Sequence, residues 1–215
     1  MPDWLIAQLP LAAAWIGYAA LHSLLAALGV KHIVERRLPG FARGYRLAFN
    51  LIAIVMLVPV LALAHAAPGP VLWQWSGAGA WIARVLMLAA AIGFVVSLRD
   101  YDIPSFLGLR QLREHARDIG EPPFHIGAMH RHLRHPWYAF GLVMVWTQTM
   151  SAAWLVSSVA ITLYFVLGSR LEEAKLVALY GKRYRRYRAR VPAFLPLPGR
   201  SLTAEDAAAL ENSPH

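Results

Sequence analysis

The sequence predicts an all-α integral membrane protein with about five transmembrane helices, a C-terminal helical hairpin and a cytoplasmic amphipathic tail. Of its 215 residues, 58% are hydrophobic and 15% are charged, whereas an average soluble domain carries about 25% charged residues. The apolar residues lie in continuous blocks, and blocks long enough to cross the hydrocarbon core indicate membrane spans. No basic stretch precedes the first block, so we expect a retained helix there and not a cleaved signal peptide.

Five apolar blocks are expected to form the spans. They run over residues 4–30, 46–67, 80–98, 137–150 and 152–170. The first three make residues 1–98 an N-terminal three-helix membrane region. The fourth block is shorter than the roughly 17 residues that a crossing helix needs. Almost nothing separates it from the fifth, so we expect these two to form a tight hairpin with Ser151 near its tip.

The distribution of Lys and Arg predicts the orientation in the membrane. Basic residues gather between spans one and two, between spans three and four, and after span five, whereas residues 67–80 and the tip near Ser151 contain none. The positive-inside rule then places the N-terminus outside and the C-terminus in the cytoplasm of a bacterial inner membrane. Arg84, near the outer end of span three, is the exception, and its long side chain can snorkel.

The net charge of +9 follows from this distribution and does not indicate nucleic acid, because no groove-reading motif is present. The chain has no cysteine, which excludes disulfides, zinc–thiolate sites and cysteine nucleophiles. Two cytoplasmic segments, residues 99–136 and 172–215, are long enough to build a site for a soluble ligand. Residues 201–215 form a separate C-terminal tail, predicted to be a short capped acidic helix with a frayed end.

The first chemically suggestive group is Arg-His-Pro-Trp-Tyr at residues 134–138. Pro136 suits the first turn of a helix, which would hold Arg134 and His135 at the membrane surface and Tyr138 one turn inside. The alternative interpretation is an interfacial anchor, because basic residues, proline and aromatics are common at the ends of membrane helices.

The second group is the adjacent pair Glu172 and Glu173 at the end of the fifth span. Two carboxylates near a membrane face are unfavourable unless they are paired. The alternative is a solvated helix turn with ion pairs such as Glu172 with Lys175.

The third group is a tyrosine-rich segment whose apolar and aromatic residues recur at steps of three and four. Its members are Leu176, Tyr180, Tyr184, Tyr187 and Val191. This spacing predicts one apolar-aromatic stripe on a helix, with arginines on the other faces. The plain interpretation is an interfacial helix bound to anionic membrane lipids, although the stripe can also cover a cofactor.

The three groups in this order, joined by a short hairpin and followed by Val-Pro, resemble the isoprenylcysteine carboxyl methyltransferase and phospholipid methyltransferase superfamily over roughly residues 125–196. The resemblance implies an S-adenosyl-L-methionine-dependent methyltransferase with its core in residues 99–200 and a tail that closes over the cofactor. Gly127 and His130 stand where the superfamily has a Gly-Pro-Tyr-like turn, with the glycine one position early. The expected cofactor-binding residues are Gly127, His130, Arg134, His135, Tyr138, Glu172, Glu173, Tyr184 and Tyr187.

The N-terminal half narrows the resemblance. Residues 21–23, 44–50 and 106–112 resemble the bacterial methanethiol S-methyltransferase branch, whose members methylate a small thiol to a thioether. A small thiol is therefore the favoured acceptor, while a lipid headgroup and a prenylated carboxylate remain open. Methyl transfer from a sulfonium is an in-line displacement that needs alignment and exclusion of water, and no metal is expected.

His22 lies inside the first span, and an intramembrane ionisable residue is a functional candidate by default. We expect it to be catalytic, since a histidine that titrates near neutral pH can deprotonate a thiol. The alternative is a neutral histidine bonded to a neighbouring helix.

A rival function comes from a different class. His22-Ser23 and His135-Pro136 also resemble NnrU-type membrane proteins, related to haem-dependent isomerases, in which case His22 and His135 would ligate haem and no methyl donor would bind. The Glu-Glu and Tyr-Gly-x-x-Tyr segments favour the methyltransferase. A membrane scaffold that binds neither cofactor is the third interpretation.

Overall fold

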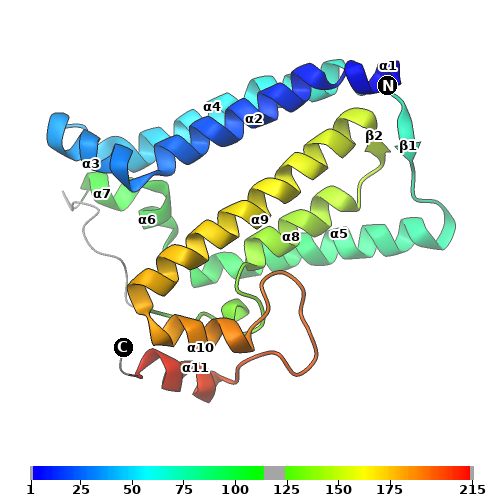
Figure 1. Cartoon of the computed structure of the whole chain (residues 1–215). Helices are drawn as coiled ribbons and strands as arrows, with labels where there is room; N and C mark the ends of the chain where they lie inside the picture. The colour runs from blue at the N-terminus through cyan, green and yellow to red at the C-terminus, as the bar shows by residue number, and fades with distance from the viewer. Residues whose placement is uncertain (1, 114–123, 214–215) are drawn as a thin grey trace. The chain divides into compact units, whose positions relative to one another are not determined.

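The computed structural model describes residues 2–113 and 124–213, which are predominantly helical (Figure 1). Within them, four segments are long and apolar enough to cross a membrane: Asp3–Ala26, Ala42–Ala66, Gly77–Asp100 and Ala152–Tyr180. A further apolar helix, α8 (Pro136–Trp146), has 11 residues, or about 16 Å of length. An all-α multi-pass membrane protein is confirmed, and the fourth apolar block is indeed too short to span alone.

The described residues group into two compact units that interleave along the sequence. The first holds described residues of Met1–Gln74, Tyr101–Gly120 and Thr149–Ala160, and the second holds those of Trp75–Asp100, Glu121–Gln148 and Ile161–His215. This grouping by contact differs from the three sequence regions 1–98, 99–200 and 201–215, which stay a prediction. Residues 114–123 of the expected cytoplasmic loop lie outside the described residues.

The helices of the first unit are α1 (Asp3–Ile6), α2 (Leu9–Ala26), α3 (Leu28–Arg37), α4 (Tyr45–Ala66), α6 (Ile103–Leu107) and α7 (Leu109–Arg113). Helices α2 and α4 lie antiparallel and side by side, since Gln8 Nε2 donates to the Ala67 carbonyl and the Tyr45 hydroxyl to the Leu25 carbonyl. The first apolar block ends earlier than expected, because Ala27 has extended backbone with ψ 136° between α2 and α3.

The segment α6–α7 binds to the start of α4 through side chains of α4. Arg46 Nη1 donates to the Ser105 carbonyl over 3.2 Å, and Asn50 Nδ2 to the Phe106 carbonyl over 3.1 Å. A Cβ on Gly108 would lie 2.6 Å from the Leu47 backbone nitrogen, and Gly108 has φ +87°, so only glycine fits this turn. Two of the three stretches that suggest the thiol branch, 44–50 and 106–112, are therefore in direct contact.

Two short strands pair in the first unit. β1 (Val71–Trp73) and β2 (Met150–Ser151) are antiparallel, with Val71 opposite Ser151 and Trp73 opposite Met150. The residue expected at a bare hairpin tip, Ser151, is thus held in a strand ladder. Sequence periodicity does not reveal a strand of two residues.

The second unit contains α5 (Gly77–Ser97) and α8, which lie side by side. A Cβ on Gly93 would lie 2.6 Å from the Phe140 ring, so the glycine allows the close approach of α8. Trp146 Nε1 donates over 3.0 Å to the Thr162 hydroxyl of α9 (Ala152–Tyr180). Helix α9 is longer than the expected fifth span and carries both glutamates inside it.

The tail of the second unit forms α10 (Lys182–Arg190) and α11 (Ala204–Glu211). The continuous stripe expected through residue 191 is wrong in one respect, because Gly181, with φ +57° and ψ −124°, ends α9 before α10 begins. Its members nevertheless share a buried cluster with Ile126, Leu202 and Ala207. The capping box of Thr203 and Asp206 starts α11, as the sequence predicts.

Candidate active site

The site is built where the chain enters α8. Pro136 occupies the first turn of that helix, where its missing N–H leaves no bond unmade. The backbone N–H groups just before it bind the chain after α10: Arg134 donates to the Pro192 carbonyl over 2.9 Å and His135 to the Ala193 carbonyl over 3.1 Å. The Arg-His-Pro element and the Val-Pro element that follows α10 are therefore one local structure.

Arg134 reaches from this junction to Glu173 of α9. Its Nε and Nη2 each lie 2.7 Å from Glu173 Oε1, and its Nη1 donates to the Arg188 carbonyl over 3.2 Å and to the Val191 carbonyl. All three guanidinium nitrogens thus have protein partners. Arg134 ties α9 and the end of α10 to the start of α8.

His135 is buried between the two glutamates, with 7% of its surface exposed. Its Nε2 lies 3.0 Å from Glu173 Oε1 and its Nδ1 lies 3.6 Å from Glu172 Oε2. The Glu172 side chain is 51% exposed, whereas that of Glu173 is 12% exposed. Within the described residues Glu172 has no ion pair with Lys175, and its nearest basic partner is His135, which forms an ion pair only when the imidazole is protonated.

An aromatic row continues from His135 into the membrane helices. The rings of His135 and Tyr138 stack with centroids 5.5 Å apart and an interplanar angle of 6°. Tyr138 in turn stacks on Phe165 of α9 at 4.6 Å and 15°, and Phe194 lies 5.7 Å from His135. Aromatic faces attract cations, so this row has the chemistry to receive a sulfonium.

Gly127 and His130 lie at a turn around Asp100, where a short 3-10 helix covers Met129–Arg131. Met129 N donates to Asp100 Oδ2 over 3.0 Å, and His130 Nδ1 lies 3.7 Å from the same oxygen. A Cβ on Gly127 would lie 2.6 Å from that carboxylate, so glycine is required by the close approach. Burial lowers the pKa of His130, although Asp100 opposes the shift.

Tyr184 and Tyr187 lie in the buried cluster of the tail. The Tyr187 hydroxyl donates to the His130 carbonyl over 2.7 Å, which fastens α10 to the turn at residue 130. Burial raises the pKa of Tyr184 well above its usual value, and the Glu173 carboxylate adds to the effect. The contact of both tyrosines with a cofactor stays a prediction.

His22 belongs to the first unit, apart from the other candidates, all of which belong to the second. Its ring lies 5.7 Å from that of Tyr18 and 4.8 Å from that of Phe49, and Phe49 is part of the 44–50 stretch. Its catalytic role stays a prediction.

The sequence of the chain is similar to that of several methanethiol S-methyltransferases. A methanethiol S-methyltransferase of Bradyrhizobium diazoefficiens is 30% identical over 183 residues, which are 83% of this chain and 69% of that protein. The chain belongs to the methanethiol S-methyltransferase family. A Mycobacterium tuberculosis protein of that name is 29% identical over 85% of this chain and 75% of its own length.

A third methanethiol S-methyltransferase, from Crocosphaera subtropica, is 30% identical over 60% of this chain, and the match spans 56% of that protein. No family model matches the chain, and no solved structure matches it. Membership of the methanethiol S-methyltransferase family confirms the branch that residues 21–23, 44–50 and 106–112 suggested. The haem-binding alternative receives no support from these comparisons.

Several residues of this chain that contact the predicted site residues are not among those predicted from the sequence. Asp100 and Phe165 are distant in sequence from the residues they contact, and only the fold brings Asp100 to the turn at residues 127–130 and Phe165 to Tyr138. Arg188 Nη1 lies 3.9 Å from Glu173 Oε2, but in the sequence it is one of many arginines in a basic tail. Phe194 carries a weak signal in the sequence, as an aromatic two residues after Pro192 of the Val-Pro element.

Proposed function

We propose that this chain is an S-adenosylmethionine-dependent methyltransferase whose acceptor is a small thiol, with methanethiol the first compound to test. The methanethiol S-methyltransferase activity that names the relatives supports the reaction. The observation that carries the proposal is the convergence of Arg134, His135, Tyr138, Glu172 and Glu173, which join in one network of ion pairs and stacked rings. An interfacial anchor would not need five such residues to contact one another.

The residues present fit the proposed methyl donor. The donor's amino acid part carries an ammonium and a carboxylate, and its sulfur is a cation. Glu172 offers a half-exposed carboxylate for the ammonium or the ribose hydroxyls, and the Tyr138 row offers aromatic faces for the sulfonium. Arg188, whose side chain is 47% exposed, offers a guanidinium for the carboxylate.

Arg134 suits a positioning role better than a direct contact with the donor. Its guanidinium already binds Glu173 and two backbone carbonyls, and a donor carboxylate would have to displace them. Arg188 Nη1 lies 3.9 Å from the other carboxylate oxygen of Glu173, and in the described residues Arg188 does not make the carbonyl bonds that Arg134 makes. We assign carboxylate binding to Arg188 and alignment of Glu173 and the tail to Arg134.

When bound, S-adenosylmethionine supplies an electrophilic methyl group on its sulfonium sulfur. The new bond joins this carbon to the acceptor sulfur as the old carbon–sulfur bond breaks, and the thiol proton is lost. The chain's own contribution is to hold the donor through Glu172 and Arg188, to align it along Tyr138 and to keep water away. His22 is the proposed acceptor of the thiol proton.

The proposed location is the bacterial inner membrane, with the N-terminus outside and the C-terminus in the cytoplasm. The positive-inside rule supports it. The polar donor would then enter from the cytoplasm, where the tail lies, and the apolar acceptor from the bilayer.

Calorimetric titration of the purified protein with S-adenosylmethionine tests the site. We expect Glu172→Ala to weaken donor binding at least tenfold, and Glu205→Ala, at an exposed position of α11, to leave it unchanged. Equal affinities in the two variants would contradict the assignment. A visible spectrum of the same sample checks the rival, because a stoichiometric Soret band would indicate haem.

A further inference from the structure

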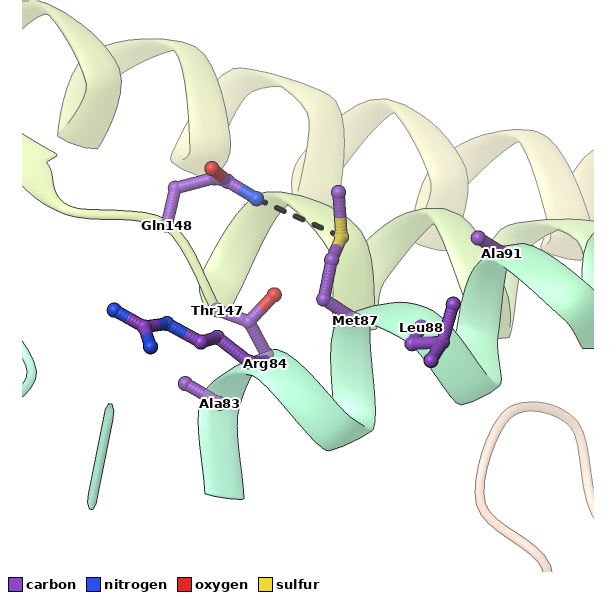
Figure 2. Close-up of a pocket in the computed structure, with 7 residues that line it drawn as sticks. All are labelled: Ala83, Arg84, Met87, Leu88, Ala91, Thr147 and Gln148. Atoms are coloured by element: carbon purple, nitrogen blue, oxygen red, sulfur yellow. Dashed lines mark hydrogen bonds between the residues drawn. The ribbon is translucent and has the colours of Figure 1, made fainter. Parts of the chain in front are cut away.

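A cavity of about 340 Å³ lies on the α5–α8 pair, at the end of α8 opposite the Arg134–Glu173 network (Figure 2). One side is a face of α5 made by Arg84, Met87, Leu88 and Ala91, whose spacing of three and four puts them on one side of a helix. The other side is the chain just after α8, with Gln148 closest to Met87 in Figure 2. The cavity therefore has an apolar floor with a single cationic side chain at its edge.

The side-chain hydrogen-bond donors of Thr147 and Gln148, which line the cavity with Arg84, are already bonded within the protein. Gln148 Nε2 donates to the Met144 carbonyl over 3.0 Å and contacts Met87 Sδ at 3.6 Å. The Thr147 hydroxyl donates to the Val143 carbonyl over 2.8 Å. Thr147 and Gln148 therefore shape the cavity, and we do not assign their bonded donor groups to ligand binding.

Arg84 differs from them. Its guanidinium lies 5.3 Å from the centre of the Trp81 ring, and in the part of the chain that the structure describes it has no carboxylate within ion-pair distance. It stands about two turns, or roughly 10 Å, into α5, from where its side chain can snorkel to headgroup level. In Figure 2 its guanidinium points away from Leu88 and Ala91.

A positive charge at headgroup level above an apolar floor matches one kind of molecule, a lipid with an anionic head and an acyl chain. We propose that this cavity binds one anionic phospholipid, with its phosphate on Arg84 and its chain along Met87, Leu88 and Ala91. The charge of a basic residue near a bilayer surface favours an anionic lipid by about 1 kcal/mol, or about fivefold. This site is independent of the proposed methyl transfer.

Native mass spectrometry of delipidated protein, given equal amounts of palmitoyl-oleoyl phosphatidylglycerol and the matching phosphatidylcholine, tests the proposal. We expect one retained lipid, with about fivefold preference for phosphatidylglycerol. Arg84→Gln should bring the ratio close to one, and Arg84→Lys should keep most of the preference. Wild-type protein without preference, or Arg84→Gln with the preference intact, would overturn the proposal.

The proposed position of the lipid acyl chain is tested by a second pair of variants. Ala91→Phe fills the cavity and should lower retention of both lipids several-fold, whereas Ala89→Phe, on an exposed face of the same helix that does not line the cavity, should not. Equal retention in these two variants would also overturn the proposal. Circular dichroism and S-adenosylmethionine titration of each variant show whether it is folded, and donor binding should equal that of wild type.

Discussion

Glu173 Oε1 accepts a hydrogen bond from Arg134 Nε over 2.7 Å and lies 2.7 Å from Arg134 Nη2, while His135 Nε2 lies 3.0 Å from the same oxygen. One carboxylate oxygen thus links a cation and an imidazole from the chain before α8 to helix α9. Because the side chains of Arg134 and Glu173 are both 12% exposed, losing Glu173 leaves the nearly buried Arg134 guanidinium with its two backbone carbonyls but without a counter-charge at that contact.

Glu173→Ala should therefore destabilise the protein. Removing one member of a buried ion pair costs about 3 kcal/mol or more, which lowers the midpoint of thermal unfolding on the order of 10 °C. Unfolding in a mild detergent, followed by circular dichroism, measures the shift. Glu172→Ala is the matched control, and because its carboxylate is half exposed we expect its midpoint to stay close to that of wild type. A lower midpoint for Glu172→Ala than for Glu173→Ala would contradict this prediction and show that Glu172 contributes more to stability.

Arg188→Ala separates donor binding from structure. The side chain is partly exposed and 3.9 Å from Glu173 Oε2, so its loss should weaken S-adenosylmethionine binding about tenfold with little change in thermal midpoint. Arg186→Ala, another exposed arginine of α10, should leave the affinity unchanged. Similar losses in both variants would mean that the tail contributes only general positive charge.

Gly127→Ala should disturb the turn at residue 130. The added Cβ would lie 2.6 Å from the Asp100 carboxylate, and forcing an extra carbon into a packed site costs about 1–3 kcal/mol. Gly168→Ala, whose Cβ would meet nothing within 4 Å in α9, should be neutral or stabilising, since alanine favours a helix. Chemical unfolding of both variants measures the difference. Equal stabilities would show that Asp100 moves aside easily.

The stability should fall as the pH drops below 6.5, the usual pKa of histidine, because burial lowers the pKa of His130 in the folded protein. Between the lowered value and 6.5 the unfolded chain binds more protons than the folded one, so protonation favours unfolding. The difference between thermal midpoints at pH 7.5 and pH 5.5 should be smaller in His130→Gln than in wild type. His132→Gln, at an exposed histidine, should retain the full difference.

The sequence predicts most of the helices because hydrophobic blocks of spanning length dominate any weaker preference. It also predicts a candidate set of site residues, because their order along the chain resembles a superfamily, and the role of that set stays a prediction. It does not predict which of these side chains contact one another. The sequence predicts that Arg134 binds the cofactor, whereas in the structure its donors bind Glu173 and backbone carbonyls of the tail. The close approach of Asp100 to Gly127 joins segments that are distant in the sequence.

The elements that the sequence analysis missed have local causes. Gly181 ends α9 inside a stripe whose spacing would suit one continuous helix, because a positive φ overrides periodicity at a single residue. Ser151 lies in a strand ladder whose partner is 80 residues away at Val71, and no local pattern encodes such a pairing.

The central claim is that this chain transfers a methyl group to a small thiol at the Glu172–His135 site. Purified protein should be incubated with S-adenosylmethionine carrying a deuterated methyl group and with methanethiol, and the headspace analysed by mass spectrometry. We expect dimethyl sulfide with one deuterated methyl group, formed at least tenfold more slowly by Glu172→Ala than by Glu205→Ala. Absence of labelled dimethyl sulfide from folded wild-type protein that binds the donor would contradict the thiol acceptor, and absence of donor binding would contradict the whole account.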